Sequence, residues 1–220
     1  MTDRGVTAPL QDDPAPAQVT ATETVFEGRV WNIRRDEVLY NGAPMVREYM
    51  DHTGAVAVLA LDEQDRVLLI KQYRHPVRMR DWEIPAGLLD IAEEQPLRAA
   101  QRELAEEADL VADRWNVLAE FTTSPGGSDE AIRIYLARGL SAADEVFART
   151  EEEADIEVRW VPLDEALDAV LARRVQNPSL VIGVLTAHAA RARDWATLAA
   201  GDEPWPRRSR PIGDAGAPQA

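Results

Sequence analysis

Apolar and polar residues alternate over much of the chain with the two-residue period of β-strands. From Thr22 to Met50 the pattern is strand-like on both sides of Asn41-Gly42, a dipeptide typical of two-residue hairpin turns. Two further apolar runs flank the polar residues 62–65 and predict a second pair of strands. Outside the hairpin, strands are predicted at residues 54–61, 66–73, 115–123, 131–138 and 156–161.

Three segments have helical spacing instead, and the two ends of the chain have neither pattern. The helices are predicted at residues 95–108, 163–173 and 178–198. Residues 1–20 and 201–220 are rich in proline, and we expect both to be disordered tails. Trp205, between two prolines, has the size to dock on the fold, but a free tail is the expectation.

Strands interspersed with helices predict a fold of the α/β class. We expect an α/β/α sandwich with a mixed sheet over residues 51–200, preceded by a small antiparallel sheet over residues 21–50. A hairpin of that size is not stable by itself. We therefore expect it to pack on a partner subunit, which makes the protein a homodimer.

Composition narrows the class of function. The chain has 220 residues, a net charge of −15 and no cysteine. The acidic balance argues against a nucleic-acid partner, which needs clustered Lys and Arg. No apolar run approaches the roughly 20 residues of a membrane span, and no signal peptide is apparent. A cytoplasmic enzyme acting on a small molecule is the simplest expectation.

The chemistry is concentrated between Pro85 and Leu110. Glu103, Glu106 and Glu107 have i, i+3 and i+4 spacing, so a helix presents them on one face. Three like charges repel one another there unless a cation lies among them. Carboxylate oxygens are ligands suited to Mg²⁺ or Mn²⁺, and we expect one of these ions as the cofactor.

The same segment resembles the sequence box of the Nudix hydrolases. That box reads Gly, five residues, Glu, seven residues, Arg-Glu, an aliphatic residue, any residue, Glu-Glu, any residue, Gly and an aliphatic residue. Here Gly87 is followed by six residues and Glu94, then by seven residues and Arg102-Glu103-Leu104-Ala105-Glu106-Glu107.

The chain departs from the box at two places. One residue is inserted between Gly87 and Glu94, which a loop absorbs at little entropic cost. Asp109 replaces the closing glycine at the predicted end of the helix, where Asp is able to adopt a left-handed backbone. Neither change removes a metal ligand. Glutamate-rich surface helices are common, but the apolar run VAVLALDEQDRVLLIKQYR before the box favours the catalytic interpretation.

The run GAVAVLALDEQDRVLLIKQYRHPVRMRDWEIPAGLLD is similar to the ADP-ribose pyrophosphatase branch of the family, in particular its actinobacterial type. The resemblance implies a Nudix fold, cleavage of ADP-ribose to AMP and ribose 5-phosphate, and dimers that exchange their N-terminal sheets. It also implies roles for residues of the box. Glu103 and Glu107 would be the central metal ligands, assisted by Glu106 and by the carbonyl oxygen of Ala86.

Other residues of the box would support these ligands. Glu94 is expected to hold Arg102 in an ion pair rather than to bind metal, or Arg102 orients Glu106. Gly87 is expected to have a structural role in the turn before the helix.

Substrate contacts and the general base are expected from outside the box. Arg74 is the best candidate for a phosphate or ribose contact, since a guanidinium binds oxyanions bidentately; an exposed arginine at a strand end is the alternative. Glu83 is expected to border the pocket, and Arg35 either reaches across a dimer or lies in solvent. Glu152, with Glu153 next, is the expected base; an exposed acidic loop is the alternative.

Two other functions remain open at this point. One is hydrolysis of another nucleoside diphosphate sugar, because the box handles the diphosphate and not the groups attached to it. The other is a ligand-sensing Nudix module without catalysis. That alternative predicts a lost box glutamate or an added DNA-binding domain, whereas the acidic set here is complete.

Overall fold

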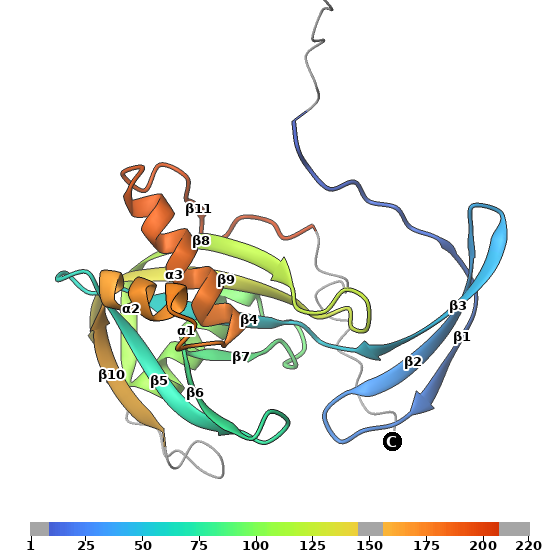
Figure 1. Cartoon of the computed structure of the whole chain (residues 1–220), viewed down its shortest axis with the longest axis horizontal. Coiled ribbons are helices and arrows are strands. Elements are labelled where there is room, and N and C mark those ends of the chain that lie inside the picture. The colour runs from blue at the N-terminus through green and yellow to red at the C-terminus, as the bar shows by residue number, and fades with distance from the viewer. Residues whose placement is uncertain (1–8, 145–155, 207–220) are drawn as a thin grey trace, which may run out of the picture. The chain divides into compact units, whose positions relative to one another are not determined.

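The computed structural model describes residues 9–144 and 156–206 (Figure 1). The chain divides into two compact units, one ending at Tyr49 and the other beginning at Met50. In the part that the structure describes, no helix has the length and apolar character needed to cross a membrane.

The first unit is a three-stranded antiparallel sheet. Its strands, in spatial order, are β1 (Gln18–Phe26), β2 (Asn32–Tyr40) and β3 (Ala43–Asp51). The predicted hairpin turn is confirmed, because Asn41 and Gly42 join β2 to β3 with φ values of 51° and 79°. Positive φ at both central residues is what a turn matching the twist of its strands requires. Strand β1 already begins at Gln18, within the segment expected to be a tail.

Side chains of the first unit are largely exposed. All nine residues of β1 are exposed, and in the described part of this unit Val38 is the one buried residue. Large apolar side chains therefore remain in contact with solvent; they include Val19, Val25, Phe26, Trp31, Leu39, Tyr40 and Val46. This sheet does not enclose a hydrophobic core of its own.

The second unit contains two sheets. The larger one is mixed, since β4 pairs with β9 in parallel and its other pairings are antiparallel. Its strands, in spatial order, are β11 (Ala199–Ala200), β8 (Leu110–Thr122), β9 (Ala131–Ala142), β4 (Ala55–Ala60) and β7 (Ala86–Leu88). The smaller antiparallel sheet consists of β10 (Glu157–Pro162), β5 (Arg66–Arg74) and β6 (Met79–Glu83).

Strand β4 separates two hydrophobic cores, and all six of its residues are buried. Its even-numbered side chains, such as Val56 and Val58, pack with Leu104 of helix α1 (Pro96–Ala108). Its odd-numbered side chains pack with the core that contains helices α2 (Leu163–Leu171) and α3 (Pro178–Arg191). Because a strand points successive side chains to opposite faces, this arrangement is the expected α/β/α sandwich (Figure 1).

Some elements differ from the sequence-based expectation. The short strands β6, β7 and β11 were not predicted, and α3 ends at Arg191 instead of near residue 198. Gly201 is buried and Trp205 packs on the fold, so the expectation of a free tail is wrong at these residues. The guanidinium of Arg133, only 2% exposed, lies 4.9 Å from the centre of the Trp205 ring and donates to the carbonyl oxygens of Glu203 and Pro204 at 2.6 and 3.0 Å.

Candidate functional site

Helix α1 carries the Nudix-like box and ends where the box glycine is replaced. Asp109 caps the helix with φ 54° and ψ 36°, the left-handed conformation expected from the sequence. Its N–H donates to the carbonyl oxygens of Ala105 and Leu104, which would otherwise lack helical partners. The substitution of glycine by Asp therefore leaves the end of the helix intact.

Gly87 of β7 allows the helix to approach the sheet closely. A Cβ atom at this position would lie 1.9 Å from Oε1 of Glu103, far inside van der Waals contact. Glycine is needed here for space and not for an unusual φ. The predicted structural role of Gly87 thus consists in bringing β7 directly against the carboxylate of Glu103.

Glu107 is held from the same strand. Its residue is 5% exposed, and its Oε2 accepts a hydrogen bond from the N–H of Ala86 at 2.9 Å. The segment Ala86-Gly87 and two glutamates one helical turn apart, Glu103 and Glu107, therefore form one compact set of oxygen-rich groups.

The helix that carries these glutamates begins at Pro96. Proline suits its first turn because it lacks the N–H that a helix start leaves unpaired.

Arg102 contacts three carboxylates around that set. It donates to Glu94 through Nε and Nη2 at 3.1 and 2.9 Å, and through Nη1 to Glu103 at 2.6 Å and Glu106 at 3.1 Å. These hydrogen bonds, that to Glu94 above all, raise the pKa of Arg102, so its charge is permanent. The structure contains the ion pair expected between Glu94 and Arg102, and it also places Arg102 against Glu106.

The ligand atoms that these residues offer are of the type that binds a divalent cation. Glu103, Glu106 and Glu107 offer hard carboxylate oxygens, and Glu107 lies beside the backbone of Ala86. Such oxygens suit Mg²⁺ or Mn²⁺ without distinguishing them. Within residues 9–144 and 156–206, no three acidic, His or Cys side chains converge as a metal ion requires. Glu103 and Glu106 instead face Arg102. Metal binding would therefore require these carboxylates to share or leave that guanidinium.

A second polar cluster joins β5 to β6. Glu83, 2% exposed, accepts hydrogen bonds from Arg74 Nε and Nη2 at 2.9 and 2.7 Å and from Gln72 Nε2 at 3.3 Å. Arg74 keeps 41% of its side chain exposed. The predicted substrate residues Arg74 and Glu83 thus lie together, with Glu83 behind Arg74. Sequence reasoning missed Gln72, although the two-residue period of a strand places it on the same face as Arg74.

The remaining candidates are not placed at this site by the structure. Arg35 of β2 belongs to the first unit, where it pairs with Glu23 at 2.7 Å and with Glu48 at 2.5 Å. The hydrogen bond to Glu48, and after it the one to Glu23, raises the pKa of Arg35. The expected base Glu152 and its neighbour Glu153 lie outside the described residues.

Comparisons with known proteins find similar sequences over most of the chain. The family model described as NUDIX domain matches residues 51–180. The chain is 43% identical over 173 residues to the ADP-ribose pyrophosphatase of Mycobacterium tuberculosis, covering 78% of this chain and 83% of that relative. It is 38% identical over 164 residues to the methanol dehydrogenase activator of Bacillus methanolicus, covering 74% of this chain and 88% of the relative.

A solved structure provides a comparison at the level of the fold. The crystal structure of an ADP compounds hydrolase matches with a TM-score of 0.67, covering 83% of this chain and 98% of that one. The two sequences are 20% identical, so the likeness concerns the arrangement of helices and strands alone.

Proposed function

Because the chain belongs to the Nudix family, we propose that it hydrolyses the diphosphate bond of ADP-ribose to give AMP and ribose 5-phosphate. The carrying observation is the contact of α1 with β7, where Glu103 meets Gly87 and Glu107 accepts from Ala86. That contact brings two acidic residues of the family's box, Glu103 and Glu107, to one backbone segment. The choice of substrate is supported by the similarity to the ADP-ribose pyrophosphatase of Mycobacterium tuberculosis at 43% identity.

The residues of α1, together with Ala86 of β7, would have different roles in the reaction. Glu103, Glu106, Glu107 and the carbonyl oxygen of Ala86 would hold Mg²⁺ or Mn²⁺. When bound, such an ion neutralises charge on the diphosphate and lowers the pKa of water. Arg102, which carries a permanent positive charge, limits the repulsion among the carboxylates and fixes two of them relative to Glu94.

Arg74 would bind an anionic or hydroxyl group of the substrate. Its guanidinium is oriented by Glu83, so part of its rotational freedom is already lost before substrate arrives. Arg74→Ala is expected to raise KM at least about tenfold with a smaller change in kcat. Arg98→Ala, which removes an exposed arginine of α1, provides the control.

Glu152 is our candidate for the group that removes a proton from the attacking water. Glu103, Glu106 and Glu107 would be engaged with metal, so a base from another segment is required. Glu152→Gln should lower kcat by roughly 10²-fold or more while leaving KM nearly unchanged. Normal turnover in this variant together with loss in Glu153→Gln would transfer the role to Glu153, and normal turnover in both would remove it from this acidic segment.

We also propose that the functional protein is a homodimer formed through the first unit and that it works in the cytoplasm. The exposed apolar side chains of β1 to β3 support the first statement, since a three-stranded sheet without a core needs an external surface to cover it. Sedimentation at micromolar concentration tests the dimer, and cell fractionation tests the location.

Turnover measured on a panel of nucleotides tests the activity itself. ADP-ribose should be hydrolysed to AMP and ribose 5-phosphate with Mg²⁺ or Mn²⁺ and not after chelation. Faster turnover of GDP-mannose or another nucleoside diphosphate sugar would retain the reaction and change the substrate. Saturable binding of ADP-ribose without turnover at any metal concentration would favour the ligand-sensing alternative.

A further inference from the structure

A cavity lies on the face of the smaller sheet opposite to the Arg74–Glu83 cluster. Strand β5 directs Ile70, Gln72 and Arg74 to one face, whereas Leu69 and Lys71 point to the other. Trp82 is the direct partner of Lys71 across β5 and β6, so it also projects away from Glu83. The cavity is lined by Leu69 and Trp82 and is therefore separated from the proposed catalytic cluster by the sheet itself.

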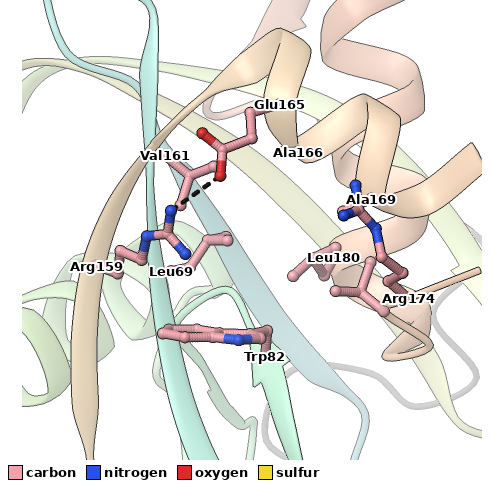
Figure 2. Close-up of a pocket in the computed structure, with 10 residues that line it drawn as sticks. Leu69, Trp82, Arg159, Val161, Glu165, Ala166, Ala169, Arg174 and Leu180 are labelled. Carbon is pink, nitrogen blue, oxygen red and sulfur yellow. Dashed lines mark hydrogen bonds and ion pairs between the residues drawn. The ribbon is translucent and has the colours of Figure 1, made fainter. Parts of the chain in front are cut away.

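Small side chains on α2 create this cavity. Ala166 and Ala169, one helical turn apart, face the strands and leave a space of about 230 Å³. Leu180 of α3 and Val161 of β10 complete its apolar lining. We call this cavity the Trp82 pocket (Figure 2). Its volume is below the roughly 300–1,000 Å³ of pockets for drug-sized ligands, which leaves room for one or two aromatic rings.

Positive charge collects at the opening of the Trp82 pocket. Figure 2 shows Arg159 on the strand side and Arg174 on the helix side. Arg159 is paired with Glu165 at 2.9 Å, and the Lys71 ammonium lies 5.1 Å from the centre of the Trp82 ring. Among the residues that the structure describes, the Arg174 side chain has no hydrogen-bonding or ionic partner. Two arginines and one carboxylate thus line the cavity, and Lys71 lies over the Trp82 ring, in a chain whose net charge is −15.

We propose that the Trp82 pocket binds a small planar aromatic carboxylate. The ring would enter the apolar space between Trp82 and the two alanines of α2, where aromatic and aliphatic contacts favour a flat apolar group. The carboxylate would accept hydrogen bonds from Arg174 at the opening. This site is separate from the hydrolysis of nucleotides and does not rest on the proposed function.

Isothermal titration calorimetry with 2-naphthoate tests the proposal on the full chain. The probe should bind saturably at one site per chain, with or without a chelator, because no metal takes part. The neutral amide 2-naphthamide should bind at least about tenfold more weakly, since it lacks the charge that Arg174 recognises. Arg174→Ala should weaken the binding of 2-naphthoate to the same degree. The control Arg193→Ala removes an exposed arginine outside the pocket and should leave binding unchanged.

Filling the pocket provides a second, independent test. Ala169→Leu places a larger side chain in the cavity on a helix that tolerates leucine, and it should abolish binding of 2-naphthoate. Ala172→Leu, at an exposed position just after α2, is the matched control and should leave binding unchanged. Absence of saturable binding to the unmodified protein would overturn the proposal. So would loss of binding in Arg74→Ala with retention in Ala169→Leu, which would place the probe on the catalytic face.

Discussion

The two units of the chain bury their residues to opposite extents. Every residue of β4 in the second unit is buried, and every residue of β1 in the first is exposed, although both strands have apolar side chains. In the second unit, helices cover both faces of the sheet, whereas in the described part of the first unit, residues 9–49, no helix covers β1 to β3. The second unit therefore buries a hydrophobic core within itself and carries the residues of the box. The first unit exposes apolar side chains that another molecule can cover.

Core truncation should produce the largest difference between the units. Leu104→Ala in α1 removes a fully buried side chain and should lower the free energy of unfolding by about 2–5 kcal/mol. Leu39→Ala in β2, where 40% of the residue is exposed, should lower it by less than about 1 kcal/mol. Urea denaturation of both variants measures this difference. A large loss for Leu39→Ala that depends on protein concentration would mean that a partner subunit buries this side chain.

Replacing glutamates by glutamine should lower kcat in the second unit but not in the first. Glu103→Gln and Glu107→Gln should each lower kcat by at least about 10²-fold, the scale of losing an electrostatic stabiliser, with thermal stability nearly unchanged. Glu37→Gln, at an exposed position of β2, should retain full activity. Steady-state rates at saturating Mg²⁺ and circular dichroism provide the two measurements. Full turnover in either α1 variant would remove that glutamate from the site.

Charge placed on the first unit should weaken association without affecting the fold of the second. Phe26→Asp combined with Val46→Asp is expected to raise the dimer dissociation constant at least about tenfold, because charged side chains would have to be desolvated in the interface. Leu185→Asp, at an exposed apolar position on α3, is the control and should leave the mass unchanged. Sedimentation velocity over a range of concentrations distinguishes these outcomes. A monomeric unmodified chain would contradict the homodimer.

The smallest expected effect is pH-dependent and lies in the second unit. Burial alone would raise the pKa of Asp62, but hydrogen bonds from the N–H groups of Arg66 and Gln64 and from the Arg66 side chain lower it overall. A lowered folded-state pKa stabilises the fold above the unfolded value near 4 and ceases to do so as pH falls through the folded value.

Asp62→Ala should therefore lower the free energy of unfolding by about 1 kcal/mol at pH 6. Its difference from the unmodified chain should shrink steadily below about pH 4. Glu63→Gln, whose side chain is 76% exposed, is the control and should show little change at any pH. Urea titrations at several pH values provide the measurement, and a difference that grows on acidification would contradict the assignment.

The predictable features are those encoded over a few residues. The spacing of Glu103, Glu106 and Glu107 predicted a shared helix face, and the Asn41-Gly42 dipeptide predicted its turn, because both depend on local backbone geometry. The left-handed Asp109 was predictable for the same reason. Strand β7 was not, since it spans three residues and exists through its pairing with β4 about thirty positions earlier in the chain.

Long-range contacts account for the other differences. Nothing near Trp205 in the sequence indicates that it lies over Arg133, which is far away along the chain. The Trp82 pocket likewise arises from alanines of α2 placed opposite a tryptophan of β6. Individually, these residue types are ordinary, and only their positions in space give them meaning.

The parallel pairing of β4 with β9 also constrains how the chain can fold. Ala55 lies beside Ile132 and Ala60 beside Ala137. The central strand β4 therefore pairs with β9 only after the long intervening stretch of chain has folded back. Contacts of this separation slow folding, whereas the β2–β3 hairpin forms from adjacent residues. During synthesis from the N-terminus, β7 and α1 leave the ribosome before β9, so the β9 edge of β4 is the later one to be covered. The emergence of β9 therefore sets the earliest moment at which β4 can gain its parallel neighbour.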